Sequence, residues 1–353
     1  MSDHRAANLT TSANPGVLMK HIAIGLMVAM VLAACGDGET ADSLDLPTDG
    51  SNTSTTTSAT TSTTTLAPET PTTSAPFEVI FTGADGVEST ITDTSRIISL
   101  NGDITEIIAA LGLADQLVAV DVTTTFPPET DALPRVGFGQ QLAPEGVLAF
   151  EPTLVIGDTQ IAPSESIEQL RSAGIPVVII DVHTTLEGVE TKIQQIAEVL
   201  GASEQGVQLS AQVRAEIAAA QELIPPEAEA PRAIYLYVRG PQQIFVFGGG
   251  MVTNALIAGA GAVDAAAETG VFGAVPLTPE ALVAAQPDVI LAPTAGVEAL
   301  GGVEALADLP GVSETPAGAA GNFLVYEDGF FLNFGPRTGQ ALNQLVSDLY
   351  SEE

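Results

Sequence analysis

PEGVLAFEPTLVI at residues 144–156 and PEALVAAQPDVIL at residues 279–291 are two copies of one pattern. Each copy begins with Pro-Glu, continues with a short apolar stretch and reaches a second proline that precedes a β-branched run. Proline suits the first position of a helix, and glutamate in the first turn complements the helix dipole. Because the second proline ends the helix, each copy predicts a short helix followed by a buried strand. Two copies about 135 residues apart are too few for a solenoid, so they predict two similar α/β lobes.

Helical and strand-like segments alternate on both sides of the middle of the chain. Short β-branched runs, such as 96–100 and 177–181, are separated by amphipathic stretches and short loops. This alternation predicts mostly parallel sheets that are covered on both faces. Between the two halves, 187–200 and 203–223 are predicted helices, and Pro225-Pro226 ends the second, which would be about 30 Å long. The predicted fold class is therefore α/β, with two Rossmann-like lobes of mostly parallel sheet joined by one long helix.

The N-terminal segment is predicted to be a signal peptide. Lys20 precedes the apolar run 22–32, which is too short to span a bilayer and ends in Leu-Ala-Ala-Cys. That ending resembles the bacterial lipobox, in which the cysteine is lipidated, so Cys35 is the predicted anchor and Met19 the predicted true start. The alternative is an ordinary secretory signal with a chance cysteine. Because Cys35 is the only cysteine of the chain, a disulfide framework is excluded.

A linker is predicted to follow Cys35, since 12 of the 14 residues from Asn52 to Thr65 are Ser or Thr. Such a composition buries almost no apolar surface and predicts a disordered tether. The predicted parts of the chain are a signal peptide (1–34), a lipid-anchored linker (35–76), an N-terminal lobe (77–185), a bridging helical segment (186–226) and a C-terminal lobe (227–353).

Charge and histidine content exclude several classes of function. The formal net charge is −34, and a surface of that sign repels nucleic acid and anionic lipid headgroups. After Cys35 the chain keeps a single histidine, His183, so zinc sites with two or three histidines are excluded. No nucleophile elbow lies near His183, and the chain has no GxxxxGK[ST] loop. We therefore predict a protein that is not an enzyme.

Four motifs carry a resemblance to a known family. They are RIISLNGDITEI at 96–107, Val136-Gly137 leading into 142–145, YVRG at 237–240 and FGPRT at 334–338. Together they resemble the substrate-binding proteins of haem ABC importers and, more broadly, the iron-siderophore and cobalamin binding superfamily, whose lobes are bridged by one long helix. The resemblance covers about residues 77 to 350.

The resemblance implies a lipid-anchored protein at the outer face of the cytoplasmic membrane. It would hold haem or a related iron complex between the lobes, as transported ligand and not as a catalytic cofactor, and deliver it to an ABC permease dimer with its ATPase. Glu145 and Glu280 match the glutamates that dock onto permease arginines in this family; the alternative is that each only stabilises its helix N-terminus. Two other functions stay open: a ferric-siderophore or cobalamin binding protein, and a surface lipoprotein without cargo that serves as an interaction or structural module.

The iron ligand is the open question of the haem interpretation. Phe138 and Phe245 occupy places where haem binders often have Tyr or His, and phenylalanine cannot coordinate iron. Both rings could stack on a macrocycle, or both could be core residues. The other candidates for an iron contact are Tyr237, Met251 and His183. Arg135 and Arg239 are the candidates for binding haem propionates or carboxylate siderophores in the cleft, because a guanidinium group suits carboxylates.

Overall fold

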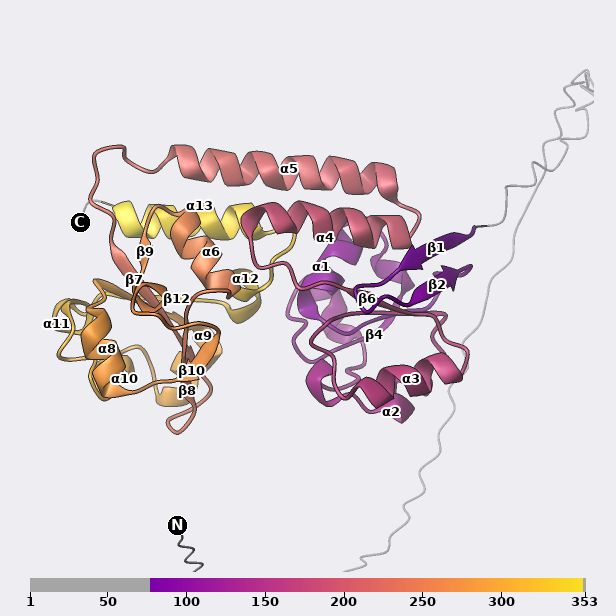
Figure 1. The fold of residues 1–353 in the computed structure, drawn as a ribbon, viewed down its shortest axis with the longest axis horizontal. Coiled ribbons are helices and arrows are strands. Elements are labelled where there is room, and N and C mark those ends of the chain that lie inside the picture. The colour runs from indigo at the N-terminus through magenta and orange to yellow at the C-terminus, as the bar shows by residue number, and fades with distance from the viewer. Residues whose placement is uncertain (1–76, 352–353) are drawn as a thin grey trace, which may run out of the picture. The chain divides into compact units, whose positions relative to one another are not determined.

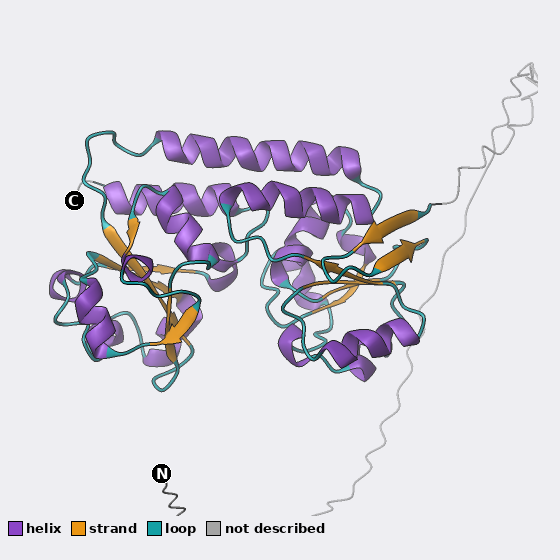
Figure 2. Ribbon diagram, viewed as in Figure 1, coloured by secondary structure: helices purple, strands orange, loops and turns teal. Residues whose placement is uncertain are grey.

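The computed structural model describes residues 77–351 (Figures 1 and 2). The predicted signal peptide, Cys35 and the Ser/Thr-rich linker lie outside the described residues. Within residues 77–351, no helix combines the length and the hydropathy that crossing a bilayer requires.

The N-terminal lobe is built on a fully parallel sheet. Its strand order is β4-β3-β5-β6, and every neighbouring pair is parallel. A separate antiparallel hairpin precedes it, with Asp85-Gly86 in the turn. The elements of this lobe are β1 (Val79–Thr82), β2 (Glu88–Ile91), β3 (Ile97–Ser99), α1 (Gly102–Ala110), the 3₁₀ helix Ala114–Gln116, β4 (Leu117–Val120), the 3₁₀ helices Pro128–Ala132 and Gly139–Gln141, α2 (Pro144–Leu148), β5 (Leu154–Asp158), α3 (Ser164–Ser172) and β6 (Val177–Ile180).

The C-terminal lobe is built on a mixed sheet of order β10-β8-β7-β11-β12, with β9 beside the start of β7. β7, β11 and β12 are parallel, whereas β8 and β10 add two antiparallel pairings at one edge. Its elements are β7 (Arg232–Val238), β8 (Ile244–Phe247), α6 (Val252–Gly259), β9 (Val263–Asp264), α7 (Ala265–Glu268), β10 (Ala274–Pro276), α8 (Pro279–Ala285), β11 (Val289–Pro293), α9 (Thr294–Leu300), α10 (Glu304–Ala307), α11 (Pro316–Ala320), β12 (Phe323–Tyr326), α12 (Asp328–Leu332) and α13 (Thr338–Tyr350).

Two helices connect the lobes, as predicted: α4 (Leu186–Val199) and the longer α5 (Ser203–Glu222). Figure 1 shows α5 lying along both α4 and α13. One continuous hydrophobic core joins these helices to the inner faces of both sheets, since it contains Ile97 and Val120 of one lobe together with Tyr235 and Leu291 of the other. Two further cores lie on the outer faces of the two sheets. The two lobes are therefore joined by a common hydrophobic core as well as by the connecting chain.

The sequence repeat is a structural repeat. α2 precedes β5 and α8 precedes β11, so each copy forms the predicted helix and strand. The residue before the second proline, Glu151 in one copy and Gln286 in the other, has a φ of 46° or 44°, and these are the non-glycine residues with positive φ in the described chain. Non-glycine residues adopt this conformation rarely, so its recurrence at equivalent positions identifies one turn used twice.

An arginine stabilises this turn in each lobe. Arg96 Nε donates to the carbonyl of Glu151 at 2.9 Å, and its Nη2 donates to that of Phe150. Arg232 Nη2 donates to the carbonyl of Ala285 at 2.8 Å, and its Nε reaches that of Gln286 at 3.2 Å. Each guanidinium satisfies carbonyls left unpaired at a helix C-terminus. The internal duplication thus extends from the quoted pattern to the start of the first strand of each sheet.

Candidate ligand-binding cleft

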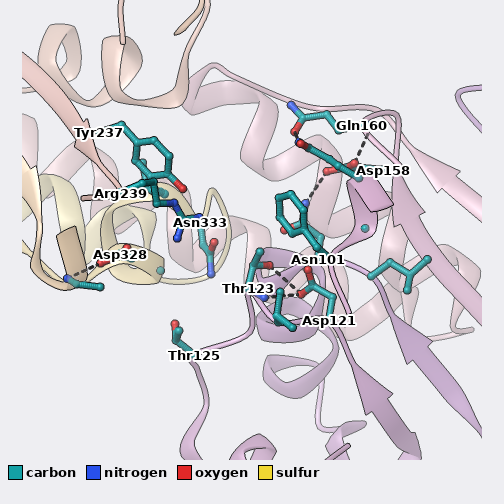
Figure 3. A pocket seen from close by; sticks show the side chains of 18 of the residues that line it. Asn101, Asp121, Thr123, Thr125, Asp158, Gln160, Tyr237, Arg239, Asp328 and Asn333 are labelled. Atoms are coloured by element: carbon teal, nitrogen blue, oxygen red, sulfur yellow. Dashed lines mark hydrogen bonds between the residues drawn. The ribbon is translucent and has the colours of Figure 1, made fainter. Parts of the chain in front are cut away.

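A cavity of about 690 Å³ lies between the two lobes. Most of its wall is made by residues at or after the carboxyl ends of parallel strands: β3, β4 and β5 in one lobe, and β7, β11 and β12 in the other. Open α/β sheets bind ligands at this end of their strands, and the volume is typical of a small-molecule site. Figure 3 shows the two groups of side chains facing each other across the gap. The carboxyl ends of the parallel strands of both lobes therefore face one shared cavity.

The wall of the N-terminal lobe is polar and ordered by hydrogen bonds. Asp158 Oδ2 accepts from Asn101 Nδ2 at 2.6 Å, which joins the ends of β5 and β3 (Figure 3). Asp121 Oδ1 accepts from the backbone N–H of Thr123 at 3.1 Å and from its hydroxyl at 2.8 Å. The Thr123 hydroxyl oxygen in turn accepts from the backbone N–H of Gly102 at 3.0 Å. These bonds fix the loops that carry the wall.

Burial raises the pKa of both aspartates. For Asp121 it raises the pKa from 3.8 to about 6, because desolvation outweighs the hydrogen bonds from the threonines. For Asp158 desolvation raises the pKa as well, against the hydrogen bond from the backbone of Gln160. Asp121 therefore changes its charge within the mildly acidic range.

Asp121→Asn should stabilise the protein at pH 7 and remove a pH dependence. The carboxyl group titrates near 3.8 in the unfolded chain and near 6 in the folded one, so the wild type loses stability as the pH rises from about 4 to 6 and stays penalised above that. The shift corresponds to roughly 1–3 kcal/mol at neutral pH, and asparagine keeps the acceptor oxygen. Urea unfolding at pH 4, 5 and 7 measures the effect. Asp115→Asn, at an exposed acid, should change stability by less than about 0.5 kcal/mol; an unchanged pH slope in Asp121→Asn would contradict the assignment.

The wall of the C-terminal lobe presents one tyrosine and one arginine side by side. Tyr237, near the end of β7, lines the cavity, and the guanidinium carbon of Arg239 lies 4.8 Å from the centroid of its ring (Figure 3). The Tyr237 ring stacks on Phe247 of β8 with centroids 4.8 Å apart. Burial raises the pKa of Tyr237, while the neighbouring Arg239 acts in the opposite direction. The site thus holds a phenol oxygen and a cation on a rigid aromatic support.

Two acidic residues at this wall, Glu327 and Asp328, have structural partners. Glu327 caps α12, because its carboxylate accepts from the backbone N–H groups of Gly329 (2.9 Å) and Phe330. Asp328 Oδ2 accepts from the backbone N–H of Ala295 at 3.2 Å and so ties the start of α12 to α9. These carboxylates organise the loops at the strand ends, as Asp121 and Asp158 do in the other lobe.

Three of the predicted contact residues line the cavity, namely Phe138, Tyr237 and Arg239. The other four lie elsewhere among the described residues. Arg135 donates to the carbonyls of Thr124 and Thr130, and His183 Nε2 lies 3.3 Å from Gln195 Oε1. Phe245 and Met251 are half-buried and pack against the core shared by the lobes.

The two repeat glutamates occupy equivalent exposed positions. Glu145 is in the first turn of α2 and Glu280 in the first turn of α8. β5 and β11 run toward the cavity, and the helix that precedes each strand must run the opposite way to connect to its beginning. Both helices therefore begin on the side of the lobes where the cavity lies.

Several lining residues were not singled out from the sequence. Asn101, Asp121 and Asp158 each lie within two residues of the carboxyl end of a short buried strand. That position was a usable signal, because polar side chains at the ends of parallel strands meet at one edge of the sheet. The residues of α12, and Asn333 that follows it, gave no such signal, since this helix was not predicted.

Comparison with known proteins agrees with this architecture. The model of the periplasmic binding protein family matches residues 97–328. The periplasmic heme-binding protein RhuT from Roseiflexus sp. RS-1 is 43% identical, with a TM-score of 0.71, covering 73% of this chain and 98% of RhuT. The heme-binding protein HmuT is 34% identical, with a TM-score of 0.75, covering 81% of this chain and 94% of HmuT.

Two curated relatives are also similar. The uncharacterized ABC transporter substrate-binding lipoprotein YvrC of Bacillus subtilis is 28% identical over 78% of this chain and 87% of YvrC. The vitamin B12-binding protein of Vibrio campbellii is 32% identical over 44% of this chain and 59% of its own length. Together with the two lobes and the shared cleft, these matches show that the chain belongs to the periplasmic binding protein family.

Proposed function

We propose that this protein is the substrate-binding component of an ABC importer, that its cargo is haem, and that it catalyses no reaction. The observation that carries the cargo assignment is the pair Tyr237 and Arg239 on the wall of the 690 Å³ cavity. The similarity to heme-binding proteins over nearly their whole length supports it.

The chemistry of the cleft suits a ferric porphyrin. Phenolate oxygen is an established ligand of haem iron, and Tyr237 is the tyrosine among the lining residues. Its raised pKa is no obstacle, because a metal ion displaces the proton of its ligand. Phe138 lines the same cavity and offers an aromatic face to the macrocycle. Arg239 offers a fork of donors for a propionate.

Arg239→Ala should weaken hemin binding by roughly 10- to 100-fold, the loss expected when a charged hydrogen-bond partner is removed. The protein carrying Cys35→Ser is titrated with hemin and followed by the Soret absorbance. Wild-type protein should give a saturable shift, and Arg135→Ala serves as the control because Arg135 lies outside the cavity lining. Equal affinity for hemin in Arg239→Ala and wild type would remove Arg239 from the site.

Cobalamin is the second candidate cargo. The similarity to vitamin B12-binding proteins favours it, and so does the lining, which contains several acids but Arg239 as its one basic residue among those described. A haem with two ionised propionates gains less from such a wall than a neutral or cationic corrinoid does. Titration with cyanocobalamin in the same cell separates the two, since saturable binding of cobalamin without hemin binding would replace haem as the cargo.

The partner in transport would be an ABC permease dimer with its ATPase. Glu145 and Glu280 are exposed and lie on the cavity side of their lobes, and their carboxylates make no hydrogen bond or ion pair with the described residues. We assign them to docking on basic residues of the permease. Cys35 would carry the lipid anchor that keeps the protein at the outer face of the cytoplasmic membrane.

A further inference from the structure

Two of the sequence motifs, 96–107 and 334–338, meet at the seam between the lobes. Glu106, on α1, accepts hydrogen bonds from Arg337 Nε at 2.9 Å and Arg337 Nη2 at 2.6 Å. It also accepts one from Asn333 Nδ2 at 2.9 Å. Arg337 and Asn333 belong to the C-terminal lobe, so these bonds cross from one lobe to the other. We call Glu106, Asn333 and Arg337 the clasp.

The clasp is shielded from water. The side chain of Glu106 is 1% exposed and that of Arg337 is 13% exposed. The guanidinium of Arg337 also lies over the ring of Phe126, at 4.1 Å from the centroid, and over that of Phe330, at 5.3 Å. One ring comes from each lobe. A buried fork of this kind accepts little deviation in angle or distance, so it specifies geometry more than it adds stability.

A second buried tie lies beside the clasp. Lys192, on α4, pairs with Asp103 of α1, and its ammonium group donates to the carbonyl of Phe334 at 3.0 Å. Asp103 lies one turn before Glu106 on α1, and Phe334 directly follows Asn333. Two contacts therefore join α1 to the loop 333–337: the clasp, and the pair of Lys192 with Asp103, in which Lys192 comes from the connecting helix α4.

At this seam, glycines of each lobe lie against side chains of the other lobe. A Cβ atom on Gly329 of α12 would lie 2.3 Å from Oγ1 of Thr125, which belongs to the other lobe. A Cβ atom on Gly102 would lie 3.0 Å from Asn333 Nδ2, again across the seam. Since Gly329, Thr125 and Asn333 all line the cavity, the distance between the lobes at the seam also sets the shape of the cavity floor.

We propose that the clasp presets the angle between the lobes in the cargo-free protein, and that Glu106, Asn333 and Arg337 are positioning residues for cargo capture. Asn333 is the link, because it lines the cavity and donates to Glu106 at once. Its amide is thereby held at the place where cargo meets the floor of the cleft. The effect on affinity rests on the proposed haem function, whereas the preset angle does not. Apparent affinity falls in proportion to the fraction of protein in the binding-competent arrangement.

The angle is measured between spin labels on α3 and α8, introduced as Gln169→Cys and Ala284→Cys in the Cys35→Ser chain. Pulsed dipolar spectroscopy without cargo should give one narrow distance distribution for this background. Glu106→Gln and Arg337→Lys should each broaden it, because glutamine loses the charge and lysine loses the fork. If the preset arrangement falls to about one tenth of the population, the apparent Kd for hemin rises about tenfold.

A steric variant tests the same seam without removing a charge. Gly329→Ala should push the lobes apart and broaden the distribution, and Thr125→Ala in the same chain should narrow it again by removing the atom that the new methyl group meets. Glu190→Gln is the control, since it breaks the exposed pair with Arg214 (2.7 Å) on the connecting helices and leaves the seam intact. It should change neither distribution nor affinity.

The outcomes separate this inference from the proposed function. Broadened distributions in the clasp variants support the preset angle, with or without hemin binding by the background chain. Unchanged distributions in Glu106→Gln, Arg337→Lys and Gly329→Ala, with circular dichroism confirming that all three are folded, would overturn it. A background chain that binds no hemin would reject haem as cargo, and the distance measurement would still decide the role of the clasp.

Discussion

Tyr237→Phe should raise the Kd for hemin by at least about 100-fold and abolish the phenolate-to-iron charge-transfer band. The substitution keeps the ring that stacks on Phe247 and the size of the cavity, so it removes the oxygen alone. Loss of an outer-shell partner of a metal ligand already costs 10- to 100-fold in affinity, and loss of the ligand itself costs more. Absorbance titration and the visible spectrum of the complex measure both effects.

Tyr235→Phe is the matched control, two residues away on the same strand. The Tyr235 side chain is fully buried, and its hydroxyl has no hydrogen-bond partner among the described residues. Removing that hydroxyl should leave hemin affinity and spectrum unchanged. If Tyr237→Phe also keeps the wild-type spectrum, the iron has another ligand or none from this chain.

The double substitution Glu145→Arg and Glu280→Arg should reduce permease-dependent uptake more than tenfold while leaving the Kd for hemin unchanged. Both side chains lie on the surface, so reversing them costs the fold only the helix-dipole contribution of about 0.3–1 kcal/mol each. Opposite a basic permease surface, however, each new arginine replaces an attraction by a repulsion, which is worth several kcal/mol across an interface. Uptake of labelled haem by cells that carry the cognate permease measures the effect.

Glu165→Arg with Glu304→Arg is the control for that experiment. These glutamates are also exposed and also in the first turn of a helix, one in each lobe. The two control substitutions change the net charge of the protein by the same amount and leave Glu145 and Glu280 in place. Normal uptake with the Glu145 and Glu280 reversal, or an equal loss with the control pair, would refute docking through the repeat glutamates.

The fold was largely predictable because its signals are local. The repeat predicted the short helices α2 and α8 at the beginning of its two copies. Periodicity and the Pro225-Pro226 break predicted α4 and α5 to within a residue or two at each end. By contrast α7, α9, α11 and α12, of four to seven residues, were missed. Such short helices are decided by a capping side chain, as Glu327 caps α12, and not by a periodic apolar face.

The cleft was less predictable because it depends on contacts between distant parts of the chain. Arg337 belongs to the FGPRT motif and stands at the start of the last helix. Its partner Glu106 is 231 residues away, and no local pattern indicates that pair. Similarly, Tyr237 and Phe245 lie opposite each other on paired strands, yet only Tyr237 lines the cavity. The direction of each side chain relative to the other lobe decides this.

The most direct test of the cargo assignment is a crystal structure of the protein soaked with hemin, with the iron located by its anomalous scattering. We predict a single iron position in the cleft, within bonding distance of the Tyr237 hydroxyl oxygen, with a propionate against Arg239. An iron position outside the cleft, or a cleft free of anomalous signal in crystals grown with excess hemin, would contradict haem capture between the lobes.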